Sequence, residues 1–98
     1  MKYRKMQNLT SFQIVAEIGT RYKQFRRAAG ITQMAVHVKT GIAVSTLSLF
    51  ENGKGQGLSF ENLVSLLKVI GLEDGLLYLV PDIPDINLER SWKLNRKK

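Results

Sequence analysis

Residues 31–53 read ITQMAVHVKTGIAVSTLSLFENG, and this stretch decides the fold. Thr32 stands where its hydroxyl can accept from free N–H groups of a helix that starts at the next residue, which predicts a helix over residues 33–39. Gly41 follows, and a glycine takes a positive φ without steric cost, so the chain can reverse there. A second helix is predicted over residues 44–52. The stretch is therefore two short helices joined by a tight turn.

Apolar residues recur on one side of each of these predicted helices. We expect Val36 to face inward from the first helix, and Leu47 and Phe50, three residues apart, to face inward from the second. Two helices joined by a glycine turn form the arrangement in which the second helix can enter the major groove of DNA.

The same stretch resembles the helix-turn-helix of Cro/phage-repressor-type regulators, the XRE family. The residues that carry the resemblance follow the order and spacing of that motif: Thr32-Gln33, the Gly41 turn, the run Ser45-Thr46-Leu47-Ser48 and Glu51-Asn52-Gly53. The resemblance covers residues 18–80. It implies an all-α protein, a compact five-helix lambda-repressor-like helix-turn-helix domain that binds double-stranded DNA.

Length and composition limit the class of protein. The 98 residues leave room for one domain with a modest core, and the hydrophobic fraction of 44% is typical of a globular chain. The lack of cysteine excludes disulfides and thiolate zinc sites. No apolar run approaches the ~20 residues that cross a bilayer, and no signal-peptide core follows the basic start. We therefore expect a cytoplasmic protein, nucleoid-associated when bound to DNA.

The net charge of +7 is distributed unevenly. Residues 1–60 carry nine Lys or Arg against two acids, residues 61–85 carry one lysine against five acids, and residues 86–98 carry five bases against one acid. The positive excess coincides with the predicted helix-turn-helix, which favours a face turned toward a polyanion. The alternative is that surface lysines only confer solubility.

Three segments are expected along the chain. Residues 1–8 form a flexible basic N-terminal arm, which either reaches along DNA or is a frayed terminus. Residues 9–80 form the helix-turn-helix DNA-binding domain. Residues 81–98 form a Pro-containing linker and a basic C-terminal tail, which is either disordered or binds a partner or more DNA.

The longest predicted helix covers residues 9–30. Thr10 and Gln13 have the form of a capping box at its start. Gly19 lies in its interior and permits a bend or a break. Its apolar stripe consists of Ile14, Ile18, Tyr22, Phe25 and Ala29.

Two further elements complete the domain. A helix over residues 58–71, capped by Ser59, is predicted to bury Phe60, Leu63, Leu66, Leu67 and Ile70. Residues 73–80 form either a fifth helix or a strand, because a short apolar run does not decide between them. The family resemblance favours the helix.

By resemblance to the phage repressors, Val44, Ser45, Ser48 and Leu49 occupy base-facing positions. None of them is Arg, Asn or Gln, so bidentate recognition of guanine or adenine is excluded there. Serine hydroxyls donate to or accept from several bases, and Val44 and Leu49 can contact thymine methyls. We therefore expect weak direct discrimination, supplemented by arms and DNA shape. The alternative places Val44 and Leu49 in the core or in a protein contact.

Phosphate contacts are expected around the motif. Gln33 begins the first motif helix, where N–H groups and the helix dipole favour an anion. Asn52 and Lys54 resemble the family's second phosphate clamp, and Lys39 and Thr46 are weaker candidates. For the two lysines the alternative is a plain solvated charge.

The resemblance also implies a structural ion pair between Arg26 and Glu51, so Glu51 is interpreted as structural and not as a catalytic acid. His37 departs from the family pattern, which has a small residue at this position. We expect it to tilt outward or to widen the helix packing. As the only histidine in a chain without cysteine it is a poor metal ligand, and no cofactor or metal is expected.

The sequence favours a DNA-binding transcriptional regulator, a repressor that acts as a homodimer. Residues 76–80 are the candidate dimer contact, with ordinary core filling as the alternative. Residues 81–98 resemble the tail of HipB-type antitoxins, so the second hypothesis is an antitoxin that binds a toxin partner and autoregulates their operon. An enzyme is the weakest hypothesis, because the sequence has no Cys/His pair and no phosphate-binding loop of the right spacing.

Overall fold

The computed structural model describes residues 8–80, within which the chain is helical and has no strand. The elements in order are α1 Ser11–Ala28, α2 Gln33–Thr40, α3 Val44–Glu51, α4 Phe60–Val69 and the 3-10 helix η2 Glu73–Tyr78. The predicted all-α fold is confirmed. Residues 1–7, in the predicted arm, and residues 81–98, the predicted linker and tail, lie outside the described residues.

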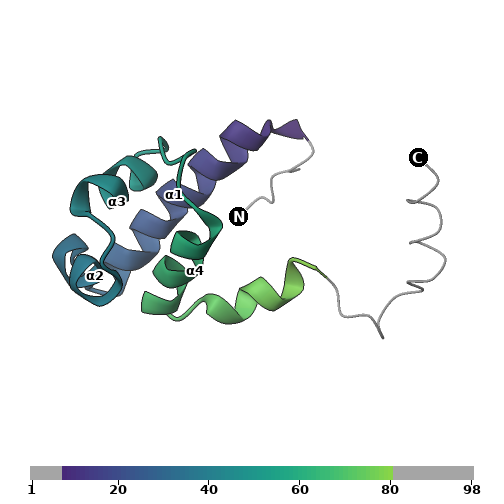
Figure 1. The fold of residues 1–98 in the computed structure, drawn as a ribbon. Coiled ribbons are helices and arrows are strands. Elements are labelled where there is room, and N and C mark those ends of the chain that lie inside the picture. Colours follow the sequence, from purple (N-terminus) through teal and green to yellow (C-terminus); the bar gives the residue numbers. More distant parts are fainter. Residues whose placement is uncertain (1–7, 81–98) are drawn as a thin grey trace.

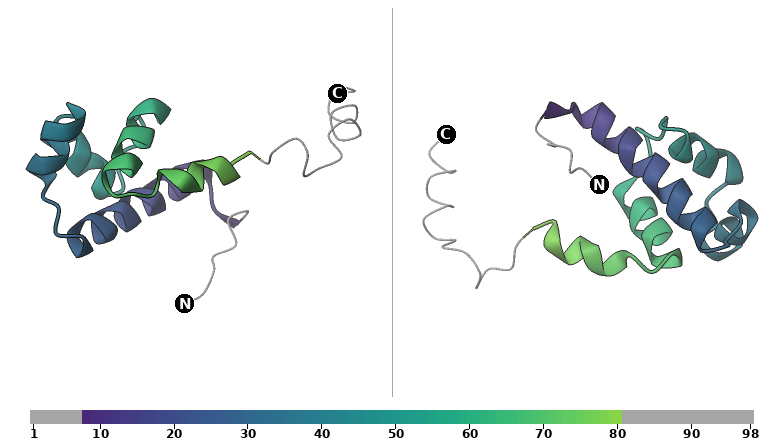
Figure 2. Two further views of the ribbon diagram at one scale, coloured as in Figure 1. Left: turned by 90° about the horizontal axis from the view of Figure 1, so that it is seen from below. Right: turned by 180° about the vertical axis from the view of Figure 1, so that it is seen from behind.

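The short helices α2 and α3 lie together at one end of the fold (Figure 1). α3 packs against α1, and α2 packs against both α3 and α4. η2 contacts α4 and lies at the end of the fold away from α2 and α3, in all the views of Figures 1 and 2. The two ends of the domain are therefore separate surfaces. Within the described residues, no helix has the length and apolar character needed to cross a bilayer.

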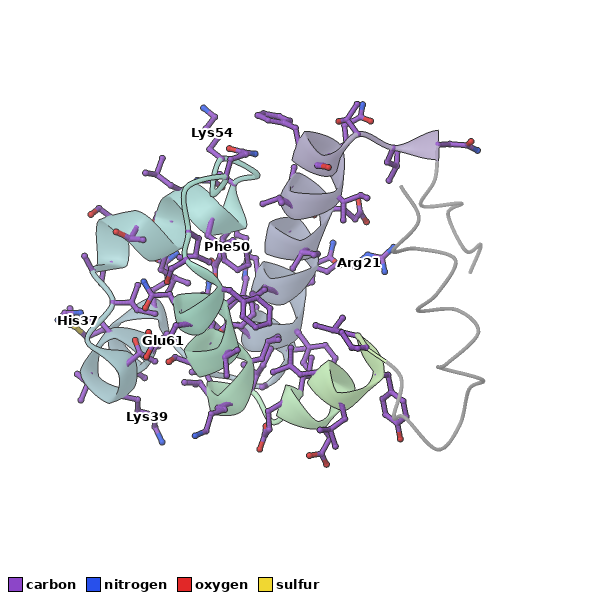
Figure 3. All side chains as sticks on the ribbon, turned by 45° about the vertical axis from the view of Figure 1, so that its right-hand side comes forward. Arg21, His37, Lys39, Phe50, Lys54 and Glu61 are labelled. Atoms are coloured by element: carbon purple, nitrogen blue, oxygen red, sulfur yellow. The ribbon has the colours of Figure 1, made fainter. Side chains whose placement is uncertain are left out.

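The core takes side chains from all four α-helices and from the turn between α2 and α3. Its buried apolar members are Tyr22, Val36, Ile42, Leu47, Phe50 and Leu66. The inward orientation predicted for the motif helices is therefore confirmed. Phe50 points into the interior (Figure 3), and the ring of Tyr22 packs against it with centroids 5.6 Å apart. The Tyr22 hydroxyl donates to the Leu66 carbonyl at 2.9 Å, which joins α1 to α4.

Local signals set the helix ends. Thr10 caps α1 and forms the predicted capping box with Gln13. Thr32 caps α2 and Ser59 caps α4, each through its side-chain hydroxyl. Gly41 ends α2 with a φ of 78°, the left-handed conformation that the turn requires.

Gly19 does not break α1, which is continuous from Ser11 to Ala28. It is buried, and a Cβ built at this position would overlap the carbonyl oxygen of Phe50. The glycine is needed because the backbones of α1 and α3 approach closely there. The sequence expectation of a possible bend is replaced by a packing role.

Two of the apolar stripes predicted from the sequence include residues that are exposed in the structure. Phe25 is 49% exposed and Phe60 is 62% exposed, and Ala29 is also exposed. Phe25 lies in the last turn of α1, Ala29 is its C-cap, and Phe60 is the first residue of α4. These positions keep the helical period but lie beyond the edge of the core.

Residues 73–80 contain the fifth helix that the family resemblance favoured, and not a strand. Glu73–Tyr78 form the 3-10 helix η2, the tighter form of helix, which buries none of its residues. The side chains from Leu77 to Val80 are between 62% and 84% exposed. Core filling is therefore wrong for them.

Candidate nucleic-acid interface

α3 has one buried face and one exposed face. Leu47, Phe50 and Glu51 point into the fold. The 3.6-residue period places Ser45, Leu49 and the C-cap Asn52 on the opposite face and Ser48 at its edge, whereas Val44 lies seven residues before Glu51 and therefore on the side of the buried residues. Ser45, Leu49 and Asn52 are exposed, whereas Val44 and Ser48 are half-buried. Three of the four predicted base-facing residues, Ser45, Ser48 and Leu49, therefore share what we call the outer face of α3, and Val44 lies at the N-terminal end of the helix beside its buried side.

The outer face of α3 carries no charge. It offers the hydroxyls of Ser45 and Ser48, the aliphatic side chain of Leu49 and the Asn52 amide. Lys54, just after α3, lies beside this face, whereas Lys39, near the end of α2, lies beside Ser65 and Lys68 of α4; both lysines are exposed and project away from the fold (Figure 3). Thr46 is half-buried and lies at the edge of the outer face, because the helical period places it between Leu49 and Phe50.

Arg26 and Glu51 hold α1 and α3 together beneath this face. Arg26 Nε donates to Glu51 Oε2 at 2.6 Å, and Nη2 donates to Oε1 at 2.9 Å. Nη1 donates to the carbonyl of Ile31 at 2.7 Å, which adds the segment before α2. The two side chains are 8% and 1% exposed. Hydrogen bonding to Glu51 raises the pKa of Arg26, so the guanidinium is charged.

Gln33 connects this ion pair to the outer face. Its Nε2 donates to Glu51 Oε1 at 3.1 Å, and its Oε1 accepts from Ser48 Oγ at 3.3 Å. The predicted phosphate contact is thus half-buried, with one Nε2 hydrogen not used by these bonds. Sequence reasoning missed the connection, since Gln33 lies 18 residues from Glu51 and 15 from Ser48.

His37 tilts toward the turn between α2 and α3. Its Nδ1 lies 2.8 Å from the carbonyl oxygen of Ile42. Because a carbonyl only accepts, Nδ1 carries the hydrogen and donates. The histidine therefore joins α2 to Ile42, the turn residue that enters the core. Among residues 8–80 no three His, Asp or Glu side chains gather as a metal site would require.

The chain matches the family model of a helix-turn-helix domain over residues 17–78. The match covers more than half of the chain and includes α2, the turn and α3. The protein belongs to this helix-turn-helix family of DNA-binding domains. Neither a curated protein nor a solved structure matches it.

Proposed function

We propose that this protein is a sequence-specific transcriptional repressor, of the Cro/phage-repressor type, that binds operator DNA as a homodimer in the cytoplasm. The observation that carries the proposal is the outer face of α3, whose Ser45, Leu49 and Asn52 are exposed on a helix within the matched helix-turn-helix domain. An α-helix of this kind fits the major groove of B-DNA.

In this proposal Val44, Ser45, Ser48 and Leu49 contact bases. Ala43 is the N-cap residue of α3, and its side chain makes no hydrogen bond to the first N–H groups of that helix. Gln33 and Asn52 lie on either side and contact phosphates, together with the exposed Lys54. Lys39 and Thr46 have secondary roles, because the first lies near the far end of α2 and the second is half-buried at the edge of the outer face.

Dimerisation is assigned to the segment 77–80. Four consecutive large apolar side chains are exposed there, and a run of this kind is costly to leave in water. The segment lies at the end of the domain away from α2 and α3 (Figure 2). A second copy bound at this end leaves both α3 helices free for two half-sites of one operator.

A fluorescence-anisotropy titration tests the DNA-binding part. The duplex upstream of the protein's own gene is compared with a scrambled duplex of equal length and composition, each at 50 mM and 200 mM salt. We expect tighter binding to the native duplex and a salt dependence that corresponds to several phosphate contacts. Equal affinity for both duplexes at both salt concentrations contradicts the proposal.

The HipB-type antitoxin hypothesis shares the exposed segment 77–80, which fits a different protein as well as a second copy. Sedimentation distinguishes the two. A dimer at micromolar concentration supports the repressor, whereas a monomer with an unoccupied apolar segment favours a heterologous toxin partner. The tail on which that hypothesis was based lies outside the described residues.

A further inference from the structure

The hydrogen-bond polarity at Gln33 follows from the ion pair beneath it. Glu51 receives two hydrogen bonds from the Arg26 guanidinium, so it is a carboxylate and offers only acceptor oxygens. The group of Gln33 that lies 3.1 Å from Glu51 Oε1 must therefore be the NH2 of the amide. The orientation of this amide is thus set by chemistry.

The orientation of Gln33 determines that of Ser48. With the NH2 directed to Glu51, the amide oxygen faces Ser48 Oγ at 3.3 Å. An amide oxygen only accepts, so the Ser48 hydroxyl must use its single hydrogen to donate to it. The lone pairs of Oγ remain, and Ser48 lies on the outer face of α3.

We propose that Ser48 acts in the DNA groove as a hydrogen-bond acceptor only, and that Glu51 sets this polarity through Gln33. An acceptor pairs with the amino group of adenine or cytosine and not with the keto oxygen of guanine or thymine. Ser48 therefore selects A or C over G or T on the strand that it faces. This inference rests on the proposed function, since it requires that α3 enters the major groove.

Ser45 provides the matched comparison on the same face. It is exposed, and its hydroxyl has no side-chain partner among the described residues. It can rotate to donate or to accept, so it has no amino-versus-keto preference of this origin. The difference between the two serines is the Gln33 contact, not the chemistry of the side chain.

The test is a binding selection from a pool of random 24-base-pair duplexes, followed by sequencing of the bound fraction. It uses the full chain and its variants S48A, Q33A and S45A. For the unmodified chain we expect one position in each half-site where A and C together exceed G and T about fivefold, the worth of one hydrogen bond. S48A removes this preference.

Q33A tests the role of the amide. Without the amide, the Ser48 hydroxyl can donate to a base as well as accept from one. The ratio of A and C to G and T at that one position should therefore fall toward equality, while preferences at other positions persist. S45A should leave the amino-versus-keto preference at the position that Ser48 contacts unchanged. The readout is a ratio of bases, and a general loss of affinity or stability does not shift it.

Two results overturn the inference. If the bound sequences are selective but S48A changes no amino-versus-keto ratio, or if Q33A retains the full ratio, Ser48 is not a polarised acceptor and the repressor proposal stands. If the bound and unbound pools have the same composition, sequence-specific binding fails, and the inference fails with it.

Discussion

Arg26 of α1 and Glu51, the last residue of α3, form a buried bidentate ion pair with a shortest N–O distance of 2.6 Å. The pair joins the longest helix to the helix that carries the outer face. Through Gln33 it also reaches Ser48 on that face. The same carboxylate thus supports the fold and orients the proposed base-contacting surface.

Replacing Glu51 by alanine leaves the Arg26 guanidinium buried without its partner. We expect the free energy of unfolding to fall by about 3 kcal/mol, as measured by chemical denaturation. Glu17→Ala is the matched control, because the Glu17–Arg21 pair is also close, at 2.8 Å, but exposed to solvent. That control should cost about 0.5 kcal/mol or less. Similar losses in the two variants would show that burial does not determine how much the Arg26–Glu51 ion pair contributes to stability.

Gly19→Ala places a methyl group against the backbone of Phe50. Because α1 must move away from α3 to admit it, we expect destabilisation of about 3 kcal/mol, at the upper end for overpacking. Gly57→Ala is the control, since a Cβ there meets nothing and the φ is not positive. Thermal unfolding of the two variants measures the difference. An unchanged melting temperature for Gly19→Ala contradicts the close helix approach.

Tyr22 makes stability sensitive to alkaline pH. Burial raises the pKa of its hydroxyl from 10.0 to about 12; the Glu51 charge adds to the shift, and Arg26 opposes it. As pH rises, the Tyr22 hydroxyl ionises in the unfolded chain before it ionises in the folded chain. Its contribution to the free energy of unfolding is therefore intact below pH 10 and is lost as pH rises to about 12. The loss amounts to as much as about 3 kcal/mol.

The measurement is denaturation at several pH values between 8 and 12. Tyr22→Phe should flatten the decline, although it also removes the hydrogen bond to Leu66. Tyr78→Phe is the control, because Tyr78 is 84% exposed. If Tyr22→Phe and the unmodified chain decline in parallel, the buried hydroxyl is not the source.

Leu77→Glu tests the dimer contact. A charge in the segment 77–80 should raise the dimer dissociation constant at least tenfold in sedimentation equilibrium, because the carboxylate would be desolvated in the contact. Val38→Glu on α2 is matched in exposure, at 74% against 73% for Leu77. It should leave the dimer intact. The assignment is wrong if both variants, or neither, dissociate.

Leu49→Ala tests the aliphatic part of the outer face. Leu49 is 52% exposed, so its truncation should change stability little. In the native duplex, replacing thymine by deoxyuridine removes only a methyl group, and we expect about a fourfold loss of affinity for each methyl that the protein contacts. The loss should shrink in Leu49→Ala. A thymine-to-deoxyuridine effect of the same size in both proteins would exclude Leu49 from this contact.

Much of the fold was predictable because its signals are local. Thr10, Thr32 and Ser59 cap helices through hydrogen bonds that span three residues. Gly41 marks a turn by its own conformational freedom, and Val36 follows the helical period. Each of these predictions needs only a few neighbouring residues.

The features that the sequence did not predict depend on packing between residues that are far apart in the sequence. Periodicity does not show where the core ends, so Phe25 and Phe60 were expected to be buried but lie beyond its edge. The close approach at Gly19 depends on how α1 crosses α3, and no spacing in the sequence signals it. The final apolar segment was ambiguous because short runs fit several structures, including the 3-10 helix that forms.

The candidate site shows the same division. The outer-face positions follow from the period of α3 once its buried residues are known. The bridge from Glu51 through Gln33 to Ser48 depends on the packing of α2 against α3, and the contact from His37 to Ile42 depends on the shape of the turn. These contacts set hydrogen-bond polarity, which a residue type alone does not specify.

The most direct test of the central claim is an NMR titration of the labelled full chain with the native duplex. We predict that the largest amide shift changes fall on Val44 to Leu49 and on Thr32 and Gln33, while amides near the segment 77–80 change little. Such a map places α3 against the DNA. Changes confined to the basic terminal residues, with the amides of α3 unmoved, would contradict the account.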